Sequence, residues 1–287
     1  MKLLRHGPKG QERPAAIDAQ GVARDLSSVI PDMDAAQLSP QGLAALRALD
    51  LSSLPAVTPE RIAVPWRGMG QFFAIGLNYA DHAEEAGMAI PIEPILFIKA
   101  NQCAVGAHHD VVLPQGSEKS DWEVELGVVI GSQARYVSEA EALQYVAGYC
   151  VVNDVSERAY QIERGGQWDK GKGCDTFGPI GPWLVTADEV ADPQNLDLWL
   201  DLNGQRVQTG NTRTMIFGVA KIISYLSQFV TLQPGDLITT GTPPGVGMGM
   251  KPTPVFLKPG DRMDLGIAGL GEQHQQVFAW DPTRIDA

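Results

Sequence analysis

A chain of 287 residues, of which 44% are hydrophobic and 20% charged, can bury a core of its own without disulfides or structural zinc. Its formal net charge of −12 argues against sequence-independent binding of nucleic acid, because phosphates are neutralised by a surplus of Lys and Arg. Three cysteines without a Cys-x-x-Cys pair argue against a disulfide framework and favour the reducing cytoplasm. With neither a signal-peptide core nor an apolar run of about 18 residues, we expect neither secretion nor membrane spanning.

Residues 1–68 predict a small N-terminal domain, because short apolar segments alternate there with Pro, Gly and Asp. One helix in this part begins at Ser39, a typical N-cap residue, with Pro40 in the first helical position. A Pro-containing stretch then leads into the apolar run at 72–75, which predicts a strand. We therefore place a boundary near residue 68 and assign residues 69–287 to a second, catalytic domain.

Strands predominate in the second domain. Apolar and β-branched runs predict them at 95–98, 111–113, 122–130, 146–152, 183–185, 196–202, 237–240 and 262–267. Helices are predicted at 80–86, 138–144, 156–164 and 215–229. Strands of irregular length with scattered helices indicate a β-rich α+β fold rather than a regular succession of βαβ units.

Acidic side chains gather at the start of the strand predicted at 122–130. Because side chains alternate between the faces of a strand, Asp121, Glu123 and Glu125 share one side of it. Side chains two apart lie roughly 6.6 Å from each other, and like charges so placed repel unless a cation lies between them. An all-oxygen acidic site favours Mg²⁺, Mn²⁺ or Ca²⁺ over zinc. The alternative is a half-exposed strand with a solvated acidic face.

Asp154 follows the buried strand predicted at 146–152 and is a candidate third oxygen ligand. Its alternative role is to cap the helix that comes next. On that helix Arg158 and Gln161 lie three residues apart and therefore share a face. They either contact an anionic ligand or are simply solvated.

The glycine-rich segment at 165–182 contains the next candidate, Lys172. Residues 166–172 imitate a phosphate-binding loop, but Gly173 stands where a Ser or Thr would hold magnesium, and no buried strand immediately precedes the loop. We therefore reject a nucleotide site. Lys172, with Thr176 four residues later, is a candidate for neutralising a developing enolate, and the alternative is a mobile surface lysine.

His82 and Glu85 lie three apart on the short helix predicted at 80–86, so the carboxylate can orient the imidazole. Such a pair can act as a general base that activates water. The alternative is an ordinary exposed helix start, because Asp81 and Glu84 form a capping-box pattern there.

The glycine- and proline-rich segment at 239–247 follows the strand at 237–240. Thr242 and neighbouring amides are candidates for holding a carboxylate, and a structural hairpin turn is the alternative. The adjacent His108 and His109 would point to opposite faces of a strand, so we do not interpret them as a metal-binding pair.

Taken in chain order, five segments resemble the signature series of the fumarylacetoacetate hydrolase family. They are Ile75-Gly-Leu-Asn-Tyr-Ala-Asp-His-Ala-Glu-Glu, Asp121-Trp-Glu-Val-Glu-Leu, Val152-Asn-Asp-Val-Ser-Glu-Arg, Gln167-Trp-Asp-Lys-Gly-Lys-Gly-Cys-Asp-Thr-Phe-Gly-Pro and Thr240-Gly-Thr-Pro-Pro-Gly-Val-Gly. The resemblance spans about residues 70–270. It implies a mixed β-sandwich roll that assembles as a homodimer or a dimer-based oligomer and acts on a small 2-oxo acid.

The same resemblance implies roles for individual residues. Glu123, Glu125 and Asp154 would be the metal ligands. His82, Glu85 and Lys172 would be catalytic. Substrate binding is expected of Tyr79, Arg158, Gln161, Thr176 and Thr242. Asp169 and Gly173 stand where the family more often has Thr or Ser, so the resemblance does not imply the fine shape of the lysine loop.

A finer resemblance concerns the opening residues 1–14 and the segment 164–168. They are similar to family members that act on 2,4-diketo-3-deoxy sugar acids in the breakdown of L-rhamnose or L-fucose. This implies a Mg²⁺-dependent hydrolase that cleaves L-2,4-diketo-3-deoxyrhamnonate between C3 and C4 into pyruvate and L-lactate. The alternatives are oxaloacetate decarboxylation, isomerisation of 2-hydroxyhepta-2,4-diene-1,7-dioate, and a non-catalytic protein that binds 2-oxo acids.

Overall fold

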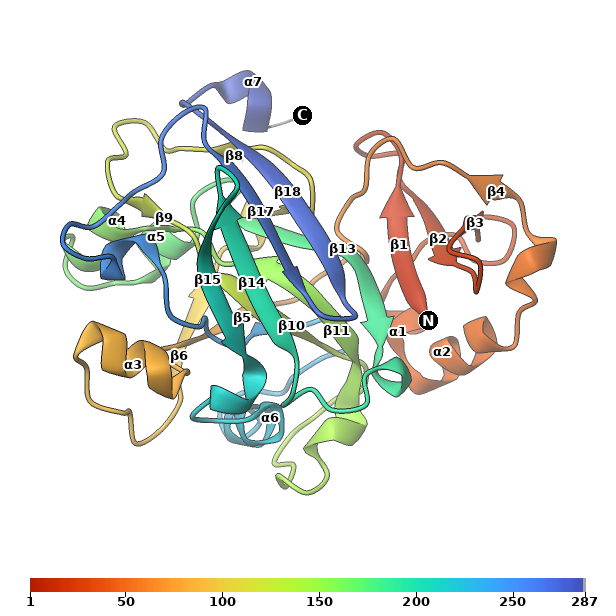
Figure 1. The fold of residues 1–287 in the computed structure, drawn as a ribbon. Coiled ribbons are helices and arrows are strands. Elements are labelled where there is room, and N and C mark those ends of the chain that lie inside the picture. Colours follow the sequence, from red (N-terminus) through yellow and green to blue (C-terminus); the bar gives the residue numbers. More distant parts are fainter. Residues whose placement is uncertain (286–287) are drawn as a thin grey trace.

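The computed structural model of the chain describes residues 1–285 and confirms a β-rich α+β fold (Figure 1). An 11-stranded mixed sheet has the main order β4-β3-β2-β1-β13-β11-β10-β16-β5-β6, with β7 paired to β13. Its strands are β1 (Lys2–His6), β2 (Arg13–Ile17), β3 (Ala23–Asp25), β4 (Ala56–Val57), β5 (Phe72–Gly76), β6 (Ile95–Lys99), β7 (Ala104–Gly106), β10 (Val124–Ile130), β11 (Val146–Asn153), β13 (Gly178–Thr186) and β16 (Leu237–Thr239).

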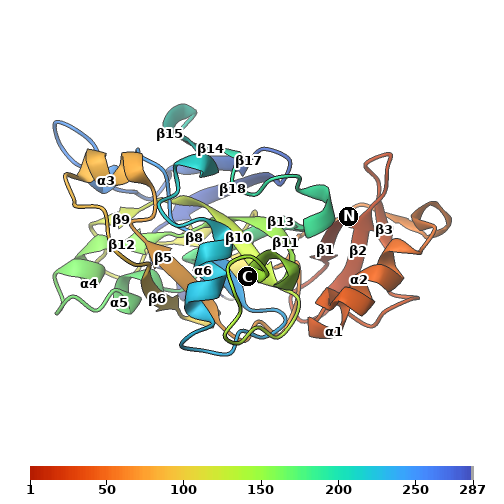
Figure 2. The ribbon, with the colours of Figure 1, turned by 90° about the horizontal axis from the view of Figure 1, so that it is seen from below.

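A 5-stranded sheet lies as a second layer over the middle of the large sheet (Figure 2). Its order is β15-β14-β17-β18-β8, and its strands are β8 (Val111–Val112), β14 (Asp197–Leu202), β15 (Gln205–Asn211), β17 (Arg262–Ile267) and β18 (Gly271–Phe278). Apolar side chains of both sheets, such as Leu126 and Leu265, belong to one buried core. The expected sandwich therefore forms by burial of the facing sides of two sheets.

Two short strands and a few helices complete the fold. Strands β9 (Ser120–Asp121) and β12 (Ser156–Glu157) pair with each other beside the sandwich. The helices are α1 (Ala35–Leu38), α2 (Pro40–Arg47), α3 (Ala80–Ala86), α4 (Arg158–Ile162), α5 (Asp169–Lys172), α6 (Val219–Leu226) and α7 (Pro282–Ile285). Within the described residues, no helix combines the length and the apolar character that crossing a membrane requires.

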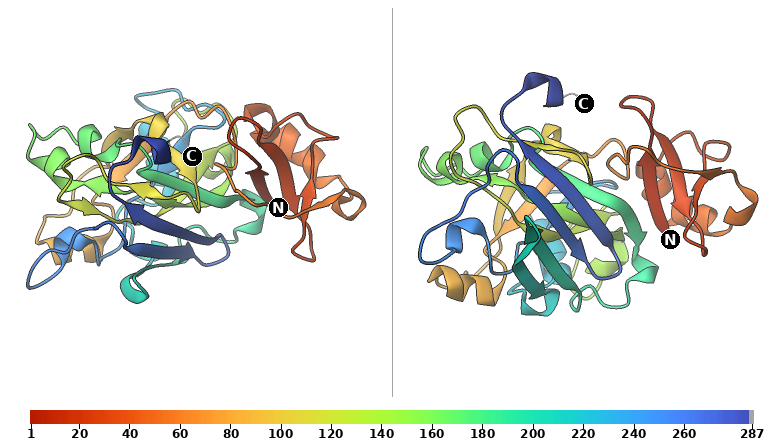
Figure 3. Two further views of the ribbon diagram at one scale, coloured as in Figure 1. Left: turned by 90° about the horizontal axis from the view of Figure 1, so that it is seen from above. Right: turned by 45° about the horizontal axis from the view of Figure 1, so that its top comes forward.

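The N-terminal elements β1–β4, α1 and α2 gather at one side of the molecule (Figure 3). They are nevertheless joined to the large sheet, because β1 pairs with β13 in antiparallel register, with Lys2 opposite Val185. Helix α2 begins as expected, with Pro40 first and the Ser39 hydroxyl accepting a hydrogen bond from the Gly42 amide at 3.1 Å. Whether residues 1–68 fold as a unit of their own stays a prediction.

Several predicted elements have the predicted bounds, including the helix at 80–86 and the strand at 262–267. Others differ. In place of the helix predicted at 138–144 only a 3₁₀ turn forms, at 142–145. The helix predicted at 215–229 is confined to α6, after Gly218 at its N-cap. The segment at 156–164 starts as strand β12 and becomes helical only from Arg158, because Ser156 and Glu157 pair with β9.

Candidate active site

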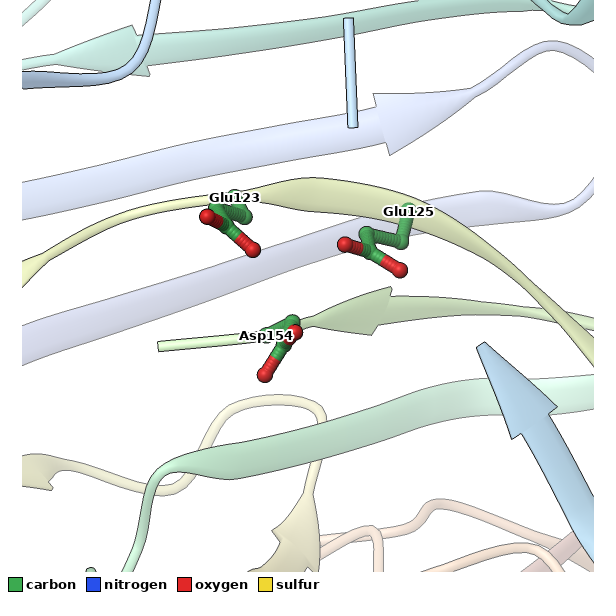
Figure 4. Close-up of side chains that lie close together, drawn as sticks. All are labelled: Glu123, Glu125 and Asp154. Carbon is green, nitrogen blue, oxygen red and sulfur yellow. The ribbon is translucent and has the colours of Figure 1, made fainter. Parts of the chain in front are cut away.

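Three carboxylates converge at the junction of β10 and β11 (Figure 4). Glu123 and Glu125 lie just before and within β10, and Asp154 follows β11 directly. The antiparallel register sets Val124 opposite Asn153, and the Asp154 amide donates to the Glu123 carbonyl at 2.9 Å. One oxygen from each of the three carboxylates lies within 4.8 Å of the others. The pairing of β10 with β11 thus brings together three side chains that are up to 31 positions apart in the sequence.

All three carboxylates are buried, with exposed fractions of 6% for Glu123, 2% for Glu125 and 1% for Asp154. The alternative of a solvated acidic face is therefore wrong. Asp154 does not cap helix α4 either, because Glu157 is the N-cap residue and accepts from the Ala159 amide at 3.1 Å.

The strand predicted at 122–130 is interrupted, which separates Asp121 from the other carboxylates. Strand β9 ends at Asp121 and β10 begins at Val124, whose amide donates to the Gln208 side chain at 3.0 Å. Asp121 instead accepts hydrogen bonds from the amides of Gly247 at 2.6 Å and Met248 at 3.0 Å. It also pairs with Arg158 at 2.8 Å.

Three buried cations face these carboxylates. Nζ of Lys172 lies 2.6 Å from Glu123 Oε2 and 2.6 Å from Asp154 Oδ2, so Lys172 is not a mobile surface lysine. Arg158 contacts Glu123 Oε1 at 2.6 Å and donates to Gln161 at 3.0 Å, so neither residue on this face of α4 is solvated. Lys99, at the end of β6, lies 2.6 Å from Asp154 Oδ1.

The pKa values of the two glutamates are shifted in opposite directions, although burial raises both. For Glu123, burial opposes ionisation, but the charges of Lys172 and Arg158 outweigh it and hold its pKa well below the usual range. For Glu125, burial and the charges of Asp154 and Glu123 raise the pKa well above the usual range. Glu125 accepts hydrogen bonds from the Thr239 hydroxyl at 2.5 Å and the Gly241 amide at 2.7 Å, which hold its carboxylate in place.

This donor set fits a hard divalent cation. Three buried carboxylates offer oxygen ligands, which Mg²⁺, Mn²⁺ and Ca²⁺ prefer. After the larger contribution of burial, repulsion by the carboxylates of Asp154 and Glu123 also raises the pKa of Glu125. A bound divalent cation would remove that repulsion.

His82 and Glu85 form a pair on α3, with Nδ1 of the imidazole 3.3 Å from Oε2 of the carboxylate. The Gly245 amide donates to both Glu85 oxygens, at 3.2 and 3.1 Å, which ties the helix to the glycine-rich segment at 239–247. The proposed capping box does not form, because Tyr79 is the N-cap residue and makes no side-chain capping bond.

One cavity of about 280 Å³ connects the carboxylates with the imidazole. The predicted site residues that line it are His82, Glu123, Glu125, Asp154, Arg158, Gln161, Lys172 and Thr242. Glu85 does not line the cavity itself but contacts His82, which does.

Two residues expected to bind substrate lie outside the lining of this cavity. Tyr79 is fully buried, and burial together with Glu125 and Asp81 raises its pKa well above the usual value. Thr176 accepts a hydrogen bond from the Val112 amide at 2.9 Å. Thr242 does line the cavity, but its hydroxyl donates to the Val124 carbonyl at 2.9 Å and accepts from Gln208 at 2.8 Å. Their roles toward a substrate stay predictions.

Residues 71–278 match the family described as fumarylacetoacetate (FAA) hydrolase C-terminal, which is more than half of the chain. The chain belongs to the fumarylacetoacetate hydrolase family. A protein of Burkholderia lata that carries the provisional name of a hydrolase is 64% identical over 278 residues, covering 96% of this chain and 99% of its own length. The chain is thus an enzyme of a hydrolase family.

Solved structures of the same family superpose over nearly the whole chain. A fumarylacetoacetate hydrolase of Exiguobacterium antarcticum is 33% identical with a TM-score of 0.84, covering 98% of this chain and 100% of its own. A maleylpyruvate hydrolase of Sphingobium sp. SYK-6 is 28% identical with a TM-score of 0.80 and the same coverages. That hydrolase is in complex with manganese(II) and pyruvate.

Sequence reasoning missed three residues that shape this member of the fumarylacetoacetate hydrolase family. Lys99 was hidden at the end of an apolar strand, where a charged residue reads as a strand terminus. Gln208 spans from the Val124 amide to Thr242 and the Pro243 carbonyl. Trp168 lines the cavity beside Phe97. The sequence signals were a lysine that closes an otherwise apolar strand for Lys99 and the place of Trp168 in the segment 164–168, whereas Gln208 left none.

The unusual Gly173 of the lysine loop also has a structural explanation. A Cβ added at Gly173 would lie 3.1 Å from the Ala100 Cβ and 3.0 Å from the Asp169 carbonyl. The lysine loop therefore packs closely against Ala100, and a larger side chain at position 173 would push the loop away from Ala100.

Proposed function

We propose that this enzyme is a Mg²⁺-dependent hydrolase that cleaves the C3–C4 bond of a 2,4-diketo acid and releases pyruvate. One observation carries the proposal: a single cavity is lined by the acidic triad, by Lys172 and by the imidazole of the His82–Glu85 pair. Hydrolysis of such a bond needs a group that polarises the 2-oxo acid, a base for water and a cation for the departing enolate. Glu123, Glu125 and Asp154 would hold the polarising cation, and His82 and Lys172 line the same cavity of about 280 Å³.

Each residue has a role in this reaction. Glu123, Glu125 and Asp154 would hold the cation, which when bound supplies Lewis-acid polarisation of the substrate carboxylate and 2-oxo oxygen. His82, oriented by Glu85, takes a proton from water as the water attacks the C4 carbonyl. The C3–C4 bond then breaks, and Lys172 stabilises the negative charge of the departing pyruvate enolate until C3 is protonated. Arg158 and Gln161 orient the substrate from one side of the cavity.

The finer substrate we propose is L-2,4-diketo-3-deoxyrhamnonate, which would give pyruvate and L-lactate. The resemblance of residues 1–14 and 164–168 to enzymes of deoxy sugar-acid breakdown supports it. Pyruvate bound to the Sphingobium maleylpyruvate hydrolase supports the pyruvate half of the product pair. We also propose that the enzyme works in the cytoplasm as a homodimer, and that Mn²⁺ or Ca²⁺ can replace Mg²⁺.

Product analysis tests the proposal against its rivals. The purified chain with Mg²⁺ is incubated with L-2,4-diketo-3-deoxyrhamnonate, other 2,4-diketo acids and oxaloacetate, and every product is identified. Stoichiometric pyruvate and L-lactate are expected. Release of CO₂ from oxaloacetate without cleavage of diketo acids would identify a decarboxylase. A shifted double bond in a dienoate without fragments would identify an isomerase, and binding without turnover would identify a non-catalytic protein.

The Glu123→Gln variant tests the ligand assignment within the same experiment. Its metal-dependent turnover should disappear, because one anionic oxygen of the triad is lost. Full activity of this variant would refute Glu123 as a ligand.

A further inference from the structure

The buried charges around the cavity set how much anionic charge a ligand can bring. Four carboxylates, Asp121, Glu123, Glu125 and Asp154, are at most 6% exposed. The cations that contact them are Lys99, Arg158 and Lys172, each at most 5% exposed. When all are ionised, the cluster has one negative charge in excess, and a bound divalent cation would turn this into one positive charge. One substrate carboxylate would then neutralise the combined charge of these seven groups and the cation.

The exposed side chains of the cavity lining offer no positive charge to a second carboxylate. The mouth of the cavity is formed by Met88, Ile162 and Met248, which are 54%, 50% and 39% exposed and come from three separate segments. Of the residues in the cavity lining, all within 1–285, only His82, Arg158 and Lys172 can carry a positive charge. Each of them already contacts a carboxylate of this chain.

An aromatic wall closes one side of the path between the buried charges and the mouth. Trp168 meets Phe97 edge to face, with ring centroids 5.4 Å apart. The Trp168 ring lies so close to Gly76 that a Cβ there would be 2.4 Å from Cζ3. Since Trp168 and Phe97 both line the cavity, this side is apolar as well.

On the basis of the function proposed above, we propose that the enzyme selects 2-oxo acids that have a single carboxylate and an uncharged far end. The carboxylate of such a substrate meets the buried charged floor, and its far end meets Met88, Ile162, Met248 and Trp168. A second, terminal carboxylate would lose part of its hydration against apolar side chains without gaining an ion partner. Dicarboxylates of the same length are therefore poor substrates.

Two diketo acids of equal length test this specificity. Butyrylpyruvate and succinylpyruvate differ only in a terminal methyl group against a terminal carboxylate, and hydrolysis of either releases pyruvate. We expect kcat/KM to be higher for butyrylpyruvate by on the order of tenfold or more. Equal values, or a preference for succinylpyruvate, would overturn the specificity and leave the hydrolysis standing. Release of pyruvate from neither would contradict the proposed hydrolysis instead.

Binding gives a readout that does not depend on turnover. The acids 2-oxoheptanoate and 2-oxoheptanedioate lack the C4 carbonyl and cannot be cleaved, so their dissociation constants are measured by calorimetry with Mg²⁺ present. The monoanion should bind more tightly by about tenfold. Tighter or equal binding of the dianion, or binding of neither acid, would overturn the proposed specificity.

A new cation at the mouth should shift the preference. Met248→Lys is compared with Met248→Gln, which has a side chain of similar length without a charge. The hydrogen bond from Met248 to Asp121 is donated by the backbone amide, so both variants keep it. The lysine variant should move the ratio of the two kcat/KM values toward succinylpyruvate by about tenfold relative to the glutamine variant. Ile162→Lys against Ile162→Gln repeats the test at the end of α4. Unchanged ratios in both folded lysine variants would overturn the proposal.

Discussion

The ammonium of Lys99 lies 2.6 Å from Oδ1 of Asp154, while Oδ2 of the same carboxylate lies 2.6 Å from Lys172. Asp154 is thus clamped between two buried lysines that come from β6 and α5. Lys99 also donates to the carbonyls of Val155, at 3.2 Å, and of Lys172. One buried cation therefore orients a candidate metal ligand and the backbone of the candidate catalytic lysine.

Replacing Lys99 with Met should weaken metal binding without removing a ligand. Partners that orient metal ligands typically contribute 10–100-fold in affinity, so we expect a rise of roughly that size in the Mg²⁺ dissociation constant, measured by calorimetry. The variant should also lose about 3 kcal/mol of stability, because Asp154 keeps a buried charge with one partner fewer. Lys170→Met, at an exposed lysine of the same helix α5, is the control and should change neither quantity. Unchanged Mg²⁺ affinity in folded Lys99→Met would show that Lys99 does not orient Asp154 for metal binding.

Glu125 should limit the stability of the metal-free protein. Its pKa is raised by burial and by Asp154 and Glu123, so at neutral pH the folded state disfavours the carboxylate. Glu125→Gln keeps an oxygen that can accept from Thr239 and Gly241, and we expect a gain of about 1–2 kcal/mol, or roughly 2–4 °C in Tm. Calorimetry should show at the same time that the variant no longer binds Mg²⁺ tightly. Lower thermal stability in the glutamine variant would contradict the repulsion inferred here.

The pH dependence of this gain has a defined sign. Because the folded-state pKa of Glu125 lies above its unfolded value of 4.5, its protonated form stabilises the fold at low pH, and that stability is lost as pH rises through the folded pKa. The Tm difference between Glu125→Gln and the wild-type protein should therefore be small near pH 4.5 and grow toward alkaline pH. Thermal scans of both proteins without metal, from about pH 4.5 to alkaline pH, measure this Tm difference. A difference that shrinks with rising pH would contradict a raised folded-state pKa of Glu125.

Gly76 should be needed for the aromatic wall of the cavity. In Gly76→Ala the new Cβ would lie 2.4 Å from Trp168 Cζ3 and 2.9 Å from Cη2, so the indole must move. Overpacking of this kind costs about 1–3 kcal/mol. We expect a higher KM with unchanged Mg²⁺ affinity, because the three atoms nearest to the added Cβ all belong to Trp168 and none to the acidic triad. In a Trp168→Leu background the same substitution should cost little, and an equal cost in both backgrounds would place the strain elsewhere.

The carboxylate motif could be found in the sequence because strand alternation is a local property. Glu123 and Glu125 were paired by their spacing, and Asp154 by its place after a buried strand; the two strands then turned out to be neighbours. The break at Trp122 and Glu123 could not be foreseen, because the Val124 amide beside it donates to the side chain of Gln208, which comes from a distant strand.

Strand β18 was missed for a related reason. Its inward-facing residues include Gln273 and Gln275, which are buried at 0% and 1% exposure, so no apolar alternation marks the strand. Their amides donate to the Val151 and Ala107 carbonyls, partners that only the folded chain provides. Strand β15, with buried Gln208 and Asn211, was hidden in the same way. Polar side chains that face inward leave no periodic signal in a sequence.

His82→Ala separates the chemistry from the metal site. The imidazole lines the cavity but does not belong to the acidic triad, so Mg²⁺ affinity should be unchanged while hydrolysis of the diketo acid falls by about 10²–10⁴-fold, the usual contribution of a positioned base. Glu85→Gln should cause a smaller loss, because the amide can still accept from Gly245 but no longer stabilises a protonated imidazole. Calorimetry with Mg²⁺ and pyruvate release are measured on the same preparations. If His82→Ala lost metal binding together with activity, the residue would be holding the glycine-rich segment and the carboxylates in place rather than activating water.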